Sequence, residues 1–217
     1  DPDFLDGSMM SLYLIPRRLL RRVILNVDRP QVLWDDLEEF TDDFEAFEIH
    51  VYARSDDVGV ADDAQIAVNA DLVAANYDRQ YFDGAGGAAS AARSAGELPT
   101  INIPGAAEGA DEYGGGTVQI PLYARTDGHK HFIHLMGRQE NNVRVQSGRW
   151  ENNNAITRIA ITPVSGTNFV ADSVFELWGI VPLATTIRRE QDNLAAGRDP
   201  LISTQALRRP FGRAWRE

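Results

Sequence analysis

The stretch from Ser147 to Ile180 constrains the fold more than any other part of this sequence. It contains a Gly-Arg-Trp turn, an alternating apolar and polar run, a turn rich in Pro, Gly and Asn, and a second alternating run. Alternation with a period of two is typical of a strand with one buried face, and Pro, Gly and Asn favour the turn between two strands. We therefore expect a short hairpin-like unit that supplies the last two strands of an all-β sandwich.

Short alternating runs recur through the rest of the chain, with turn residues between them and little helical periodicity. About nine or ten such strands suit a jelly-roll-like antiparallel β-sandwich with extended N- and C-terminal arms. The proline in the run 118–122 indicates an edge strand or a bulge. The clearest run puts Phe47, Ile49, Val51 and Ala53 on one face and Glu48, His50, Tyr52 and Arg54 on the other. The candidate strands cover residues 23–27, 31–34, 47–54, 64–69, 77–82, 118–122, 132–136, 143–146, 156–162 and 174–181.

Two segments of small residues are predicted to be loops. Residues 84–96 consist mainly of Gly, Ala and Ser, and residues 105–116 are acidic and rich in Gly. Loops of this length are usually functional or mobile. The acidic segment 35–47 is expected to form a short helix or a loop, and residues 191–197 a helical turn that ends at Gly197.

Composition limits the classes of protein that this chain can belong to. Its 217 residues suffice for one large β-domain with terminal arms. No apolar run has the length of a membrane-spanning helix, so no membrane partner is expected. The chain has no cysteine, which excludes disulfides and thiolate metal sites. In residues 9–25 the arginines follow the apolar stretch, the reverse of a signal peptide, so we do not expect a leader there.

Charge is distributed unevenly along the chain. The net charge is −11, yet residues 1–22 hold four Arg and three Asp, and residues 188–217 hold seven Arg and four acids. The remainder therefore carries about −15, which is unsuited to nucleic acid because a phosphate-binding surface needs to be basic. We divide the chain into an N-terminal arm (1–22), a β-sandwich domain (23–187) and a C-terminal docking arm (188–217).

The arms combine arginines with apolar residues, a composition that predicts docking on a partner. Solvated tails are the alternative, although disordered tails seldom carry so many large apolar side chains. The predicted partner-binding residues are Arg17, Arg18, Arg188, Arg189, Leu201, Arg208, Arg209, Phe211 and Trp215.

Two clusters have residue types that can bind a metal ion. His129 and His131 lie on one side of a strand at i and i+2, whereas His134 faces the other way. A second cluster, the acids Asp56, Asp57, Asp62 and Asp63, could form a Ca²⁺ site, but its spacing does not match a twelve-residue calcium loop. A solvated turn is the favoured interpretation of the acidic segment. We predict no metal and no cofactor.

Motifs for catalysis are also missing from the sequence. It has no Gly-x-Ser-x-Gly elbow, no cysteine nucleophile and no Lys-Ser/Thr after its glycines, so we predict that the chain is not an enzyme. A sugar-binding site is the other possibility for its polar and aromatic residues, although strand tryptophans of small sandwiches are usually buried. The candidates are Trp150, Trp178, Tyr77 and Tyr81, with Asn141, Asn142, Asn152, Asn153 and Asn154.

Several phrases of the sequence, taken in order, resemble β-sandwich structural proteins of tailed-bacteriophage virions. The resemblance covers about residues 23–181 and leaves both arms outside it. It implies a non-enzymatic virion protein, such as a capsid decoration (cement) protein that binds the major capsid protein on the capsid surface as a homotrimer. A tail-associated adhesin that binds a host-surface glycan is the alternative. The phrases are residues 53–82, INIP (101–104), VQIPLYART (118–126), SGRW (147–150), AITRIAITP (155–163) and FELWGI (175–180).

Overall fold

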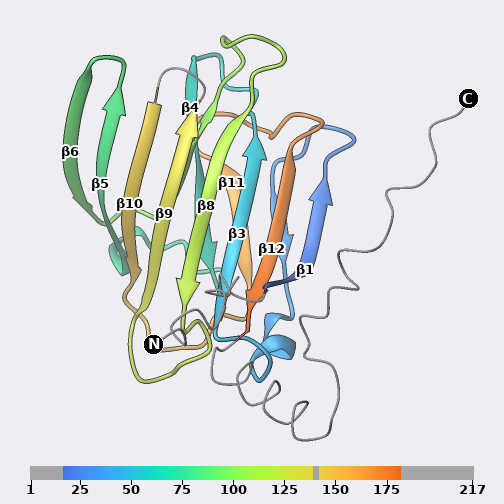
Figure 1. The fold of residues 1–217 in the computed structure, drawn as a ribbon, viewed down its shortest axis with the longest axis vertical. Helices are drawn as coiled ribbons and strands as arrows, with labels where there is room; N and C mark the ends of the chain where they lie inside the picture. The colour runs from blue at the N-terminus through green and yellow to red at the C-terminus, as the bar shows by residue number, and fades with distance from the viewer. Residues whose placement is uncertain (1–16, 139–141, 182–217) are drawn as a thin grey trace, which may run out of the picture. The chain divides into compact units, whose positions relative to one another are not determined.

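The computed structural model describes residues 17–138 and 142–181. The chain divides into residues 17–180 and a second unit, 1–16 with 181–217, nearly all of which lies outside the described residues. Residues 17–180 form two antiparallel sheets, which confirms the predicted all-β sandwich (Figure 1). The strands are β1 (Arg17–Ile24), β2 (Val32–Trp34), β3 (Ala46–Ala53), β4 (Ala61–Val68), β5 (Tyr77–Ala85), β6 (Ala88–Ala95), β7 (Thr100–Pro104), β8 (Gly114–Pro121), β9 (Lys130–Arg138), β10 (Asn142–Trp150), β11 (Ile159–Pro163) and β12 (Val174–Ile180).

Eight of these strands follow the jelly-roll pattern. Four strands of the large sheet, in the order β1-β12-β3-β8, face the small sheet, whose order is β2-β11-β4-β7. Beyond β8 the large sheet continues with β9-β10-β5-β6, which come from two hairpins inserted into the jelly roll. We call these four added strands the extension. In Figure 1 the extension occupies the end of the large sheet opposite β1, and β4 and β11 of the small sheet lie behind the large sheet.

The alternation of β3 places its residues as the sequence predicted. Phe47 and Ile49 have no exposed surface and lie in the core between the sheets. Glu48, on the other face, is also buried at 3% exposure, because its carboxylate contacts Arg17 and His50, each at 2.6 Å. Burial opposes ionisation of Glu48, but the hydrogen bonds from His50 and Gln119 and the charge of Arg17 outweigh it and lower the pKa of Glu48. The outward face of the jelly-roll half therefore carries paired charges.

The closing unit differs from the predicted hairpin. β11 pairs with β2 and β4 in the small sheet, whereas β12 pairs with β1 and β3 in the large sheet. The two strands are therefore consecutive in the chain but lie in opposite layers, as the crossover connections of a jelly roll require. Residues 147–150 belong to neither, because they form the end of β10.

The prediction of a loop at residues 84–96 was wrong. This segment completes β5, turns at Gly86 and Gly87, and returns as β6, with Ala85 opposite Ala88. Gly86 has a φ of 57°, which the tight turn between two antiparallel strands needs. Alanine is uncommon in strands, and β6 is exposed along nearly its whole length. The sequence of β6 therefore lacks the alternation of apolar and polar residues that predicts a strand.

The second predicted loop, residues 105–116, ends earlier than expected because β8 begins at Gly114. A Cβ on Gly115 would lie 2.1 Å from the carbonyl oxygen of Val51, so only glycine allows β3 to approach this closely. At the N-terminal side, β1 begins at Arg17, six residues before the expected first strand. The acidic segment 35–47 contains a 3-10 helix (Leu37–Phe40) and the start of β3.

The remaining helical element is a 3-10 turn (Ala74–Asn76) before β5. Neither short helix among the described residues has the length and apolar character needed to cross a membrane. The helical turn predicted at 191–197 lies outside the described residues.

Candidate functional site

Five large apolar side chains gather on the outward face of the extension, where β9, β10 and β5 lie side by side (Figure 1). Leu135, Val145 and Phe82 form a row across the three strands, because Val145 lies opposite Leu135 in β9 and opposite Phe82 in β5. Ile133 and Val143 flank this row. We call these five residues the apolar surface. Each is between 46% and 59% exposed, and exposed apolar clusters of this kind mark interaction surfaces.

The opposite face of the extension carries two largely buried arginines with their acidic partners. Arg144 donates to both oxygens of Asp83, at 3.1 and 3.0 Å, and lies 3.4 Å from Asp63 of the small sheet. The hydrogen bond from Arg144 lowers the pKa of the Asp83 carboxyl group. Next to this pair, Arg138 contacts Glu108 at 2.8 Å, and both arginine side chains are only 12% exposed. The extension therefore turns Arg138, Arg144 and Asp83 towards the small sheet and its large apolar side chains outwards, and its outward face carries one ion pair, Arg149–Asp78, in the row beyond Ile133.

The acidic segment after β3 holds a turn of the backbone in place. Asp62 accepts the N–H groups of Ser165 and Gly166, each at 2.9 Å, and Asp56 accepts those of the next two residues at 2.6 and 2.9 Å. Burial opposes the ionisation of Asp56, but these hydrogen bonds outweigh it and lower the pKa of its carboxyl group. The two carboxylates thus fix the connection between β11 and β12 to the start of β4.

His131 and His134 lie on opposite faces of β9, as the alternation predicted, whereas His129 lies in the loop before the strand. His129 and His131 are exposed, whereas His134 points inwards and is 1% exposed. Burial lowers the pKa of His134 to about 3, so this ring is neutral in the folded protein at neutral pH. Within the described ranges 17–138 and 142–181, no three His, Cys, Asp or Glu residues are grouped as a metal site would require.

The aromatic candidates for sugar binding separate into buried and accessible residues. Trp150 and Tyr77 are 1% exposed and form part of the core. Both are anchored to Asp71, since the indole N–H of Trp150 donates to its carboxylate at 2.7 Å and the Tyr77 hydroxyl donates to its carbonyl oxygen at 2.9 Å. Trp178 and Tyr81 are partly exposed. Trp150 and Tyr77 therefore have no free ring face on which a sugar could stack.

The asparagine candidates do not form a common site with these aromatics. Asn142 begins β10, whereas Asn152, Asn153 and Asn154 follow the opposite end of that strand. Asn141 lies outside the described residues.

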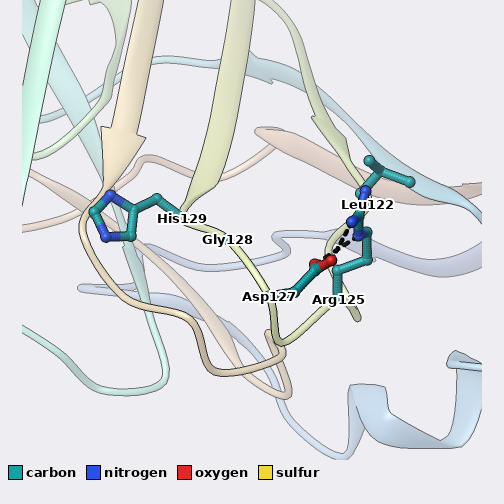
Figure 2. Close-up of a pocket in the computed structure, with 5 residues that line it drawn as sticks. All are labelled: Leu122, Arg125, Asp127, Gly128 and His129. Atoms are coloured by element: carbon teal, nitrogen blue, oxygen red, sulfur yellow. Dashed lines mark hydrogen bonds and ion pairs between the residues drawn. The ribbon is translucent and has the colours of Figure 1, made fainter.

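A small pocket lies in the loop between β8 and β9. Its volume is about 150 Å³, and its lining comes entirely from residues 122–129 of that one loop. Figure 2 shows Arg125 and Asp127 facing one another, joined by hydrogen bonds of which one measures 2.7 Å, while the His129 ring points away from them. Because the two charged groups neutralise each other, the pocket offers little to a charged ligand.

Of the residues predicted to bind a partner, the structure describes Arg17 and Arg18. Arg17 forms the ion pair with Glu48 described above, and the Arg18 guanidinium lies 5.9 Å from the ring centroid of Phe44. Both side chains therefore contact the sandwich itself, although Arg17 keeps 45% of its side chain exposed. The other seven predicted residues, Arg188, Arg189, Leu201, Arg208, Arg209, Phe211 and Trp215, lie outside the described residues.

Sequence reasoning missed the apolar surface. The available signal was the run Phe132–Met136, in which apolar residues occupy both sets of alternating positions. Phe132, His134 and Met136 point into the protein, whereas Ile133 and Leu135 point outwards. A strand that is apolar on both faces is usually covered on both.

Comparison of the chain with protein-family models, with curated proteins and with solved structures finds no match. The resemblance to phage sandwich proteins therefore stays a prediction.

Proposed function

We propose that this chain is a non-enzymatic structural protein of a tailed-bacteriophage virion, a capsid decoration protein that binds the major capsid protein and stabilises the shell. The apolar surface is the observation that supports an assembly role most directly, because large aliphatic side chains exposed on a sheet are stabilised when another protein covers them. The order of the phage-like phrases along a jelly-roll sandwich supports the virion as the place of assembly. In this proposal the C-terminal arm, with its arginines and apolar residues, contacts the shell.

A tail-associated adhesin is the second candidate, and it has less support. Two of the four aromatic residues that could stack on a sugar are buried, and the asparagines are divided between the two ends of β10. Trp178 and Tyr81 are left as accessible rings. Trp178 donates to Glu176 at 2.9 Å and lies opposite Glu48, whose carboxylate is already paired with Arg17 and His50, so these acids have a structural role.

The test of the decoration role is the copy number of this chain in particles of the phage that encodes it. Quantitative mass spectrometry should find a number near that of the major capsid protein. A number lower by an order of magnitude would indicate the tail or a vertex, and absence from the particles would contradict a virion role. Deletion of residues 188–217 should abolish binding to particles that lack the protein, while a circular dichroism spectrum typical of β-sheet is retained.

A further inference from the structure

We propose that the apolar surface packs against the same surface of a second copy of this chain, sheet on sheet, across a two-fold axis. This contact goes beyond the proposed virion role, because it concerns two copies of the chain and holds or fails independently of any particle. It also differs from the homotrimer that the resemblance implies.

The distribution of charged and apolar side chains between the two faces of the extension indicates that its outward face is covered. In a sheet with one wet face, the charged side chains normally face water and the apolar ones face the core. Here Arg144 and Arg138 are 12% exposed on the side of the small sheet, whereas Leu135 and Val143 are each 59% exposed on the outward side. This arrangement is stable in an assembly in which the outward face is also covered.

Charge indicates that the covering partner is a second copy. The chain has a net charge of −11, and 24% of its residues are charged, so most pairs of surfaces on two copies would repel each other. In the three outward rows that cross both the extension and β8, Arg93 at the edge is the sole charged residue, and in the row beyond Ile133 the charge of Arg149 is paired with that of Asp78. Two such faces can approach without opposing like charges. The rows are Gln119-Ile133-Ser147-Gln80-Arg93, Thr117-Leu135-Val145-Phe82-Ala91 and Gly115-Gly137-Val143-Gly84-Ala89.

The size and form of the apolar surface suit a contact between two sheets. Each partner in an interface of standard size contributes about 800 Å², and the apolar surface supplies five large side chains that are each about half exposed. The apolar centre and the uncharged polar residues around it therefore match a standard interface. Small residues at its edge, such as Ala89, Ala91 and Gly137, let two sheets approach to their usual spacing of about 10 Å.

Val145 lies at the centre of the apolar surface, so a two-fold axis through this centre brings Val145 close to its equivalent in the second copy. We therefore expect the full chain to sediment in the analytical ultracentrifuge with twice the mass of one chain. Val145→Glu and Val145→Lys should each weaken dimerisation by roughly 100-fold or more, because each buries two like charges without partners. An equimolar mixture of the two variants should form dimers again, since Glu then faces Lys.

Val164 provides the matched control, because it is 53% exposed, close to the 50% of Val145, and lies in the turn after β11, outside the apolar surface. Val164→Glu and Val164→Lys should leave the dimer intact, and circular dichroism should show that all four variants are folded. A wild-type chain that sediments as a monomer or a trimer would overturn the proposal. So would a dimer that survives Val145→Glu, or Val145 variants that remain monomeric when mixed, since either result would mean that another surface or another partner is involved.

Discussion

Removal of the Asp62 carboxylate tests whether the acidic segment serves to fix the turn between β11 and β12. Asp62 is 4% exposed and accepts the N–H groups of Ser165 and Gly166, more than a hundred residues further along the chain. A hydrogen bond to a charged group contributes about 1.5–3 kcal/mol. Asp62→Ala removes two of these long-range bonds to a charged group, so we expect the free energy of unfolding to fall by about 3–5 kcal/mol. Urea denaturation at pH 7, followed by tryptophan fluorescence, measures this change.

Asp57 supplies the control within the same segment. Its carboxylate accepts the N–H of Gly59 at 3.0 Å, a local contact, so Asp57→Ala should cost about 1 kcal/mol or less. Equal losses in the two variants would refute the argument. The explanation would also fail if Ca²⁺ stabilised the wild type strongly and Asp62→Ala removed that effect, because the carboxylate would then act as a metal ligand.

Three further predictions concern the sandwich. The pKa of His134 is lowered to about 3 in the folded protein, whereas in the unfolded chain the ring is protonated below its ordinary pKa of 6.5. The free energy of unfolding should therefore fall as the pH decreases, by about 2 kcal/mol more between pH 7 and pH 5 in the wild type than in His134→Leu. Urea titrations at pH 7 and at pH 5 would measure this difference. Trp150→Phe removes a hydrogen bond of 2.7 Å to Asp71 and opens a cavity, and should cost about 2–3 kcal/mol in the same titration at pH 7; an unchanged midpoint would mean that Trp150 is not held in the core. Gly179→Ala would place a Cβ 2.4 Å from the Phe44 ring, so we expect a loss of about 1–3 kcal/mol and a lower thermal midpoint, and no loss would contradict this packing.

The proposed decoration role and the proposed contact between copies use different surfaces of the molecule. A dimer would cover the extension and leave β1 and the outward charges of the jelly-roll half accessible. Glu48, His50 and Arg17 form their contacts on that half, and it is a different part of the sheet from the apolar surface. A decoration protein could therefore self-associate through the extension and still contact a shell through other parts of the chain.

The sequence was sufficient to predict those strands whose burial alternates. The run that forms β3 alternates with a period of two, and its apolar residues lie in the core. Successive side chains of a strand point to opposite faces, so the order of apolar and polar residues predicts which face is buried. The same rule placed His131 opposite His134. It also indicated that Trp150 belongs to the core, although the hydrogen bond that anchors it to Asp71 joins residues far apart in the chain and had no local signal.

What only the tertiary structure decided is how the strands combine. β6 has small residues and exposed faces, so its pairing with β5 comes from backbone hydrogen bonds that no side-chain pattern records. The partition of β11 and β12 between two sheets, and the alignment of Phe82, Leu135 and Val145 in one outward row, depend on registers between strands that are distant in sequence. Residue order thus determines which face of a strand is apolar, whereas only the assembled sheets determine whether that face meets the core or the outside of the molecule.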